Sequence, residues 1–459
     1  MAKKAQTVFV CSECGYESPK WIGQCICGAW NSFSEERISD TSASGAMAAK
    51  NRGRKTAKPV SIKNITSSEE ERLDTGIGEL NRVLGGGIVK GSLTLISGEP
   101  GIGKSTIILQ TAAAISNKYG KVLYVSGEES QEQIRIRADR IGGLAEDLFV
   151  LSEMEVEAIV DTIAQEEPVF FIIDSIQTLY SNQLTSAAGS VSQVRACSAE
   201  IMRIAKEKNI PAFIVAHVTK SGELAGPKIV EHLVDTVLNF VGERNHGFRI
   251  LRSFKNRFGN TSEIGAFEMS QEGLKEINDL SSSLLEESSQ GEGGAVTTAV
   301  YEGSRPLLLE VQALVVNSGL GFSRRSSIGI DQGRLNMIIA VLEKKTGLNL
   351  MSSDVYVNVA GGIKPEGTGI DLAAAIAIYS AAAGKPVRCK ETLIVGELGL
   401  TGELRGVPQP ERVAGEAVRM GFKRIILPMK NKEKWTSKEE IEVLGAADIM
   451  EAVKIALRD

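Results

Sequence analysis

The chain has 459 residues, of which 42% are hydrophobic and 24% charged, a globular composition long enough for two or three domains. Its net charge of −5 argues against a protein that binds nucleic acid over its whole surface. No apolar run reaches the ~20 residues that cross a bilayer, and the opening MAKKAQTVFV lacks the apolar core of a secretory signal, so we expect a cytoplasmic protein without membrane contact.

The charge is unevenly distributed along the chain. Residues 1–60 carry nine basic residues against five acidic ones, a net +4. Residues 61–280 carry 22 against 30, a net −8, and residues 281–459 carry 21 against 22, a net −1. The negative net charge of the whole chain therefore conceals a basic N-terminal segment.

Four of the six cysteines lie within the first 27 residues. Cys11 and Cys14 are separated by two residues, a spacing that lets two thiolates bind one tetrahedral Zn²⁺. Cys25 and Cys27 are separated by a single residue where two are usual, so their binding geometry stays open. Free or redox-active thiols are the alternative, but the density of cysteines favours a zinc-binding module over residues 1–34.

Residues 35–60 are rich in Ser, Ala and basic residues and have almost no large apolar side chains. This composition predicts a flexible linker. Its basic residues include Lys50, Arg52, Arg54, Lys55 and Lys58.

An α/β pattern begins at Ser92 and occupies the predicted domain 61–280. Apolar runs predict strands and apolar residues at helical spacing predict helices. The predicted strands are 92–97, 121–126, 169–175 and 211–218, and the predicted helices are 130–141, 155–167 and 190–208. Two later runs, TVLNFVGE and FRILRSFKNRF, predict a further pair of strands.

A phosphate loop follows the first of these strands and leads into a helical segment. The sequence GEPGIGKS fits the pattern G-x-x-x-x-G-K-[ST], in which glycine backbone amides face the phosphates of ATP. Lys104 would reach the β- and γ-phosphates, and the Ser105 hydroxyl would bind Mg²⁺. The predicted nucleotide-binding residues are Gly98, Glu99, Pro100, Gly101, Ile102, Gly103, Lys104, Ser105 and Thr106.

Polar residues at the ends of the next strands complete the expected ATPase site. Asp174 ends the apolar run VFFIID and is expected to hold Mg²⁺ through water. Glu128 follows the strand KVLYVS and is the preferred residue to activate the attacking water, with Glu129 as its competitor. His217 is either a γ-phosphate sensor or an ordinary buried histidine.

A second break, rich in Ser, Glu and Gly, covers residues 279–295, and no phosphate loop follows it. Residues 281–459 mix strand-like runs with helical segments at 334–347 and 371–384, each closed by glycine. An α+β domain is expected.

The motifs together resemble the bacterial RadA (Sms) family of DNA repair proteins. The resemblance rests on the cysteine cluster, LDTGIGELNRVLGGGIVKGSLTLISGEPGIGKST, YVSGEES, FIIDSIQT, AHVTKSGELAGPKIVEHLVDTVLNF and KNRFG. It implies a RecA-like ATPase core and a C-terminal domain like that of Lon protease, of the ribosomal protein S5 domain 2-like fold. It also implies a homo-hexameric ring that acts as a DnaB-type, DNA-dependent ATPase and helicase, drives branch migration of recombination intermediates, and works with the RecA recombinase.

The same resemblance assigns roles to individual residues. Glu128 corresponds to the water-activating glutamate of RecA-like proteins, and Lys255 and Arg257 of the KNRFG motif correspond to basic residues that reach the ATP of a neighbouring subunit. Single-stranded DNA would contact the loops after the strands that end near Asp174 and His217. Candidate DNA-binding residues are Lys220, Lys228, Arg324, Arg325, Arg334 and Lys345.

The Lon-like region lacks the chemistry of a protease, which needs a Ser nucleophile and a Lys base. Gly369 stands at the nucleophile position, with Thr368 beside it, and Glu411 stands at the base position, next to Arg412. We therefore expect no peptidase activity and a scaffolding role. An ATP-dependent Lon-like protease and a KaiC-like regulatory ATPase remain the alternative functions.

Overall fold

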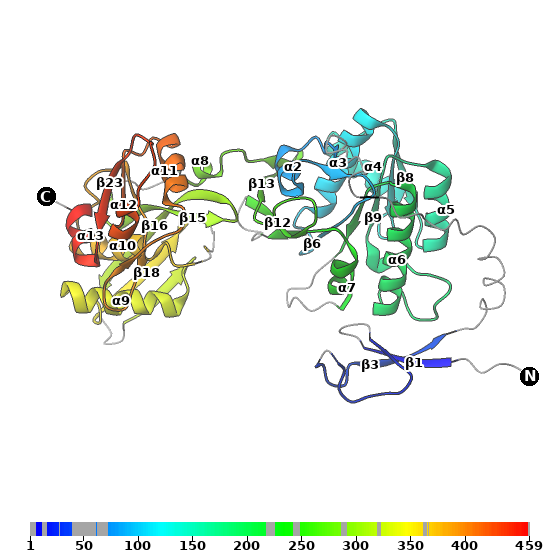
Figure 1. The fold of residues 1–459 in the computed structure, drawn as a ribbon, viewed down its shortest axis with the longest axis horizontal. Coiled ribbons are helices and arrows are strands. Elements are labelled where there is room, and N and C mark those ends of the chain that lie inside the picture. The colour runs from blue at the N-terminus through cyan, green and yellow to red at the C-terminus, as the bar shows by residue number, and fades with distance from the viewer. Residues whose placement is uncertain are drawn as a thin grey trace, which may run out of the picture. The chain divides into compact units, whose positions relative to one another are not determined.

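The computed structural model describes residues 6–11, 16–26, 28–38, 61, 72–216, 225–241, 248–285, 292–318, 323–360, 365 and 367–457. The chain divides into two compact units, Met1–Glu276 and Ile277–Asp459 (Figure 1). In the part of the chain described, no helix has the length and apolar character needed to cross a membrane.

A nine-stranded sheet in the order β14-β13-β12-β11-β6-β10-β9-β7-β8 forms the centre of the first unit. The six strands from β11 to β8 are parallel, and β12, β13 and β14 extend the sheet as an antiparallel meander. Their bounds are β6 Leu93–Gly98, β7 Val122–Ser126, β8 Leu148–Ser152, β9 Phe170–Asp174, β10 Ala212–Val215, β11 Thr236–Val241, β12 Phe248–Asn256, β13 Ile264–Ser270 and β14 Gly273–Glu276.

Helices cover both faces of this sheet, which explains why its central strands are apolar without alternation. In β9, Phe170 and Ile172 belong to one buried cluster, whereas Phe171 and Ile173 belong to the other. The predicted helices and strands of this region are confirmed to within a few residues at their ends. The helices are α2 Gly78–Leu84, α3 Lys104–Tyr119, α4 Gln131–Arg140, α5 Val156–Glu166, α6 Val191–Lys208 and α7 Ala225–Leu233.

Short strands complete the first unit. β4 Arg72–Leu73 pairs with β5 Ile88–Val89. The N-terminal module is a sheet in the order β2-β1-β3, made of β1 Gln6–Cys11, β2 Glu17–Ser18 and β3 Phe33–Ile38. Because β3 pairs with β1 along its whole length, this sheet runs to Ile38, into the predicted linker.

The second unit is the expected mixture of strands and helices. One sheet has the order β15-β16-β18-β17 and another the parallel order β19-β22-β23. The strands are β15 Ala295–Glu302, β16 Arg305–Asn317, β17 Arg325–Ile328, β18 Ser353–Val359, β19 Thr392–Ile394, β20 Glu397–Leu398, β21 Leu404–Arg405, β22 Arg424–Pro428 and β23 Glu442–Ala446. The helices are α8 Leu280–Leu285, α9 Gln332–Thr346, α10 Asp371–Ala383, α11 Pro410–Arg419, α12 Met429–Glu433 and α13 Ile449–Ala456.

Two glycines end helices of this unit as the sequence predicts. Gly347 after α9 and Gly384 after α10 have φ of +74° and +65°, the left-handed conformation of a helix C-cap. Between its ends α10 is almost entirely buried, from Asp371 to Ile378. It is therefore the central helix of the unit.

Candidate functional site

The phosphate loop connects strand β6, which ends at Gly98, to helix α3, which begins at Lys104. Gly98, Gly101 and Gly103 have φ of +147°, +78° and +121°, conformations that residues with a Cβ rarely adopt. A Cβ on Gly98 would also lie 3.0 Å from the carbonyl oxygen of Phe240. Glycine is therefore required here by the backbone itself, and a glycine loop opening a helix is a binding site for phosphate.

Lys104 is the buried basic residue of this loop, with 3% of its surface exposed. Its Nζ donates hydrogen bonds to the carbonyl oxygens of Gly98, at 2.8 Å, and Glu99, at 3.0 Å. Burial lowers the pKa of the Lys104 ammonium to about 8, while the carboxylates of Asp174 and Glu128 act in the opposite direction. Phosphate oxygens placed beside it would compensate this desolvated cation.

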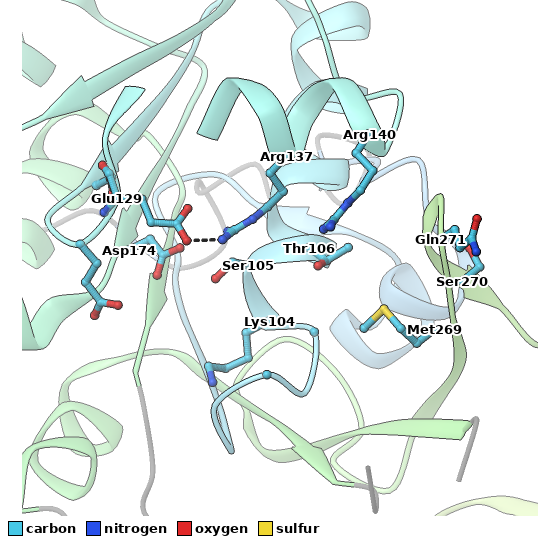
Figure 2. A pocket seen from close by; sticks show the side chains of 14 residues that line it. Lys104, Ser105, Thr106, Glu129, Arg137, Arg140, Asp174, Met269, Ser270 and Gln271 are labelled. Atoms are coloured by element: carbon cyan, nitrogen blue, oxygen red, sulfur yellow. Dashed lines mark hydrogen bonds and ion pairs between the residues drawn. The ribbon is translucent and has the colours of Figure 1, made fainter. Parts of the chain in front are cut away.

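Asp174 ends β9 and lines the same cavity as Ser105 (Figure 2). The buried Tyr124 hydroxyl, from the neighbouring strand β7, donates a hydrogen bond to Asp174 Oδ2 at 2.5 Å. Burial and the adjacent Asp174 raise the pKa of Tyr124 well above its usual value, so the hydroxyl keeps the proton it donates. Tyr124 thus orients a carboxylate that, with the Ser105 hydroxyl, fits the oxygen ligands of Mg²⁺.

The adjacent glutamates after β7 have different partners. Glu128 Oε1 accepts a hydrogen bond from the hydroxyl of Ser175, the residue that follows Asp174. Glu129 forms an ion pair with Arg137 of α4 instead, and its amide donates to Ser126 Oγ at 2.9 Å. Only Glu128 is therefore tied directly to the segment that carries Asp174.

These groups face one cavity of 760 Å³. Figure 2 shows Arg137 and Arg140 projecting into it from α4, and Met269, Ser270 and Gln271 at the right, on the side away from Glu129 and Asp174. The sequence motifs did not identify these five residues. The two arginines stand three residues apart at the end of a predicted helix, which was an available signal, whereas nothing local marks residues 269–271. The lining residues are Gly101, Gly103, Lys104, Ser105, Thr106, Ser126, Glu128, Glu129, Arg137, Arg140, Asp174, Met269, Ser270 and Gln271.

Lys255 and Arg257 do not line this cavity. Lys255 Nζ donates to the carbonyl oxygens of Glu231, at 2.8 Å, and His232, at 3.4 Å, near the end of α7. Arg257 Nη1 lies 3.1 Å from Oδ1 of the buried Asp235. The two basic side chains are therefore held beside α7, away from the phosphate loop of their own chain.

Of the two loops expected to contact DNA, the structure describes only the first, Tyr180 to Gln193. The buried Gln193 side chain accepts from the Ser181 amide at 2.8 Å and donates to the Ser186 carbonyl at 3.0 Å. These bonds close the loop on itself. His217, Lys220 and the side chain of Lys228 lie outside the described residues, as do the basic positions of the linker.

Four further DNA-binding candidates lie in the second unit. Arg324 and Arg325 stand at the start of β17, and Arg334 and Lys345 are on α9. Arg334 Nε lies 3.0 Å from Oδ1 of Asp371, whose side chain is fully buried, and its Nη2 donates to the Leu398 carbonyl at 3.1 Å. Because these bonds engage its guanidinium inside the unit, Arg334 is poorly placed to reach a phosphate, whereas Arg324 and Lys345 are exposed.

The protease-like region forms a separate cavity of 240 Å³. Gly369 and Thr368 line it, while Glu411 lies outside it in the first turn of α11. The structure gives Thr368 a partner that the sequence did not reveal, since its Oγ1 donates to Glu397 Oε2 at 2.5 Å. Glu397 also pairs with Arg405 at 3.3 Å, so its carboxylate is already engaged by a second side chain.

Cys11 and Cys25 are buried within the N-terminal module, at the end of β1 and in a tight turn. The turn is closed by hydrogen bonds from the Cys25 amide to the Ala29 carbonyl, at 2.8 Å, and from the Gly28 amide to the Cys25 carbonyl, at 2.9 Å. Gly28, with φ of +92°, permits that turn. Two buried thiols at a strand end and a tight turn fit half of a zinc site, and Cys14 and Cys27 lie outside the described residues.

Three family models match the chain. They are an AAA domain over residues 56–223, a rubredoxin metal binding domain over residues 9–35, and subunit ChlI of Mg-chelatase over residues 327–431. These matches confirm the expected fold class, a RecA-like ATPase core with an N-terminal zinc ribbon and a Lon-like C-terminal domain. They also confirm ATP, Mg²⁺ and Zn²⁺ as its cofactors.

Curated relatives resemble the chain over its whole length. The DNA repair protein RadA of Bacillus subtilis is 51% identical, over 99% of this chain and 99% of its own. Those of Halalkalibacterium halodurans and Listeria monocytogenes are each 48% identical, over 100% of both chains. Among solved structures, the RadB recombinase is 22% identical with a TM-score of 0.36, over 45% of this chain and 100% of that one.

Proposed function

The chain belongs to the RadA family of DNA repair proteins, and from this premise we propose that it is a DNA-dependent ATPase that moves along single-stranded DNA and drives branch migration of recombination intermediates. The observation that carries the proposal is the cavity in which a phosphate loop, Asp174 and Glu128 converge. This arrangement supports ATP hydrolysis. The DNA repair role comes from the relatives.

The chemistry of the site follows from its residues. The glycine loop and Lys104 bind the phosphates and hold the γ-phosphate in place. Ser105 and Asp174 would hold Mg²⁺, which supplies positive charge at the phosphate oxygens. Glu128, oriented by Ser175, accepts a proton from the attacking water.

Completion of the site is proposed to require a second subunit. Hydrolysis needs a cation at the γ-phosphate in the transition state, and such a group is often supplied in trans. In a ring of six subunits, Lys255 and Arg257 would serve the nucleotide of the neighbouring chain. Their absence from the cavity of their own chain supports this assignment and makes turnover depend on assembly.

DNA would pass along the loops that follow β9 and β10, with Lys220 and Lys228 as phosphate contacts and with Arg324, Arg325 and Lys345 as further candidates. Phosphate contacts predict sequence-independent, salt-sensitive binding.

The RecA recombinase is the proposed protein partner. The C-terminal domain is proposed to act as a scaffold without peptidase activity, because Gly369 and Glu411 replace nucleophile and base.

The decisive experiment is ATP hydrolysis with and without single-stranded DNA, followed by branch migration on a three-strand intermediate. We expect DNA to stimulate hydrolysis and ATP to drive strand movement, and we expect Lys104→Ala to abolish both. Equal hydrolysis rates with and without DNA across a salt series would overturn the proposal. Peptide cleavage that is lost in Thr368→Ala would favour the protease alternative, and phosphate incorporation into the chain without strand movement would favour the KaiC-like one.

A further inference from the structure

The three basic residues that line the nucleotide cavity differ in what they bind. Lys104 donates to carbonyl oxygens of the phosphate loop, and Arg137 forms an ion pair with Glu129. Arg140 is exposed, and among the residues that the structure describes it has no hydrogen bond or ion pair. A guanidinium that lines a ligand cavity without such a partner is available to the ligand.

The position of Arg140 in the cavity points to the part of ATP that it meets. Mg²⁺ and the γ-phosphate belong at the end where Asp174 stands, so the ribose and the base must extend away from that end. Arg137 reaches Glu129, and Arg140 stands one turn, about 4.5 Å, farther along α4. Figure 2 shows both Arg140 and Met269 to the right of Arg137, on the side away from Asp174. The two side chains therefore line the end of the cavity that the base would occupy.

Met269 comes to this end of the cavity from the last residues of β13. Its side chain lies against the phosphate loop, since a Cβ added to Gly103 would be 3.0 Å from Met269 Cε. The neighbouring strand β14 is fixed to α3, because the Gln110 side chain accepts from the Leu274 amide at 3.1 Å and donates to the Leu274 carbonyl at 3.2 Å. Met269 is still 36% exposed, so its thioether is accessible to an aromatic ring, a favourable partner for sulfur.

We propose that the base of ATP lies between the Arg140 guanidinium and the Met269 thioether, with one face of the ring against each. A guanidinium plane stacks on a base, and a methionine sulfur contacts an aromatic ring. Both contacts are made to the faces of the ring, so this pair of residues selects a large aromatic face and favours purine over pyrimidine nucleotides. The inference rests on the ATP site of the proposed function and does not depend on DNA.

The test compares two ligands of the full-length chain by isothermal titration calorimetry with Mg²⁺, the non-hydrolysable ATP analogue AMP-PNP and inorganic tripolyphosphate, which has no base. Arg140→Ala is expected to weaken AMP-PNP binding about tenfold, and Met269→Ala about threefold. Both variants are expected to bind tripolyphosphate like wild type. In steady-state hydrolysis the KM for ATP should rise by the same factors with kcat nearly unchanged, because the base takes no part in the reaction.

Arg135 supplies the matched control, because it is an exposed arginine of the same helix that does not line the cavity. Arg135→Ala is expected to bind both ligands like wild type. Arg140→Lys keeps the charge but not the planar group, so it is expected to recover only part of the affinity for AMP-PNP. The proposal is overturned if Arg140→Ala binds AMP-PNP like wild type, or if it loses the same factor for tripolyphosphate, which would make Arg140 a phosphate contact.

The outcome can be separated from a failure of the proposed function, since both ligands are titrated without DNA. Wild-type hydrolysis that ignores DNA altogether would refute the proposed function, whereas the difference between Arg140→Ala and wild type in AMP-PNP affinity would remain. DNA-stimulated hydrolysis with an unaltered KM for ATP in Arg140→Ala would refute the base site alone.

Discussion

The two units each place a glycine-containing loop before a buried helix, but they use the start of that helix differently. In the first unit, α3 begins at Lys104 beside an open cavity, so its N-terminal amides and a cation are available to a phosphate. In the second unit, α10 begins at Asp371, whose fully buried carboxylate accepts bonds from Arg334 and from the Leu398 amide. The first turn of α3 therefore faces a cavity that a ligand can fill. At the start of α10, the Leu372 amide is already bonded to the Gly396 carbonyl of the same chain.

The comparison teaches that the first amides of a helix are available to an anion only where the chain has not already bonded them, as the Gly396 carbonyl bonds the Leu372 amide at the start of α10. The first site is a reactive centre that gains its missing charge from outside. The second is the ion pair of Arg334 with the buried Asp371, in which the two charges of the chain balance each other. Substitutions in the two sites are therefore expected to affect different measurements.

The largest effect is expected from Lys104→Ala. Removing the cation that faces the phosphates should lower ATP turnover about 10³-fold, because the charge of the transition state is no longer balanced. A coupled-enzyme assay of phosphate release measures the effect. Thermal unfolding of both units should stay close to that of wild type, and a variant that hydrolyses ATP normally would contradict the assigned role.

Glu128→Gln should lower turnover about 10²-fold while ATP binding is kept, since the amide cannot accept the proton of the attacking water. Glu129→Gln removes an ion pair with Arg137 that is partly exposed, so only a few-fold change is expected. Single-turnover kinetics compare the two variants. A larger loss of turnover in Glu129→Gln than in Glu128→Gln would assign the activation of water to Glu129.

Arg334→Met tests the ion pair between Arg334 and the buried Asp371. Leaving the buried Asp371 without its partner is expected to destabilise the C-terminal unit by about 3–5 kcal/mol. Differential scanning calorimetry measures this loss, and Arg324→Met, an exposed neighbour in the same unit, is the control. An unchanged melting temperature in Arg334→Met would show that the pair contributes little.

Tyr124→Phe is expected to have a moderate effect, confined to the Mg²⁺ dependence of ATP hydrolysis. Without the hydroxyl that orients Asp174, the Mg²⁺ concentration needed for half-maximal ATPase activity should rise about tenfold. The maximal rate at saturating Mg²⁺ should be nearly retained, which a purely structural defect would not allow. A Mg²⁺ requirement equal to that of wild type would remove Tyr124 from the site.

The smallest effect is expected from Thr368→Ala. Neither ATP turnover nor peptide cleavage should change, because Thr368 has as its partner a carboxylate that also pairs with Arg405. Assays with a fluorogenic peptide and with ATP measure both activities. A change in either one would mean that the second cavity has a chemical role.

The sequence predicted those parts of the fold and the site whose signals are local. The phosphate loop, the buried strand before Asp174 and the glycine ends of α9 and α10 each depend on neighbouring residues, and their elements are confirmed. Strand β8 gave no clear signal because it lies at the edge of the sheet and is only partly buried.

Contacts between distant segments could not be predicted in this way. Tyr124 meets Asp174 only because β7 and β9 pair in the register that sets Ser126 beside Asp174. Residues 269–271 reach the nucleotide cavity through the long meander of β12, β13 and β14. The hydrogen bond from Thr368 to Glu397 likewise joins residues 29 positions apart, so no local sequence pattern predicts it.

The buried Asp235 has a consequence for the reach of Arg257. Its carboxylate also accepts bonds from Lys206, at 2.7 Å, and from the Leu93 amide, at 3.1 Å, at the start of the strand that leads to the phosphate loop. Both of these donors bind Oδ2, whereas Arg257 binds Oδ1. Loss of the Arg257 contact would therefore free Oδ1 but leave the charge of the carboxylate balanced by the Lys206 ammonium. The proposed contact of Arg257 with the nucleotide of a neighbouring subunit would therefore not leave Asp235 as an uncompensated buried charge.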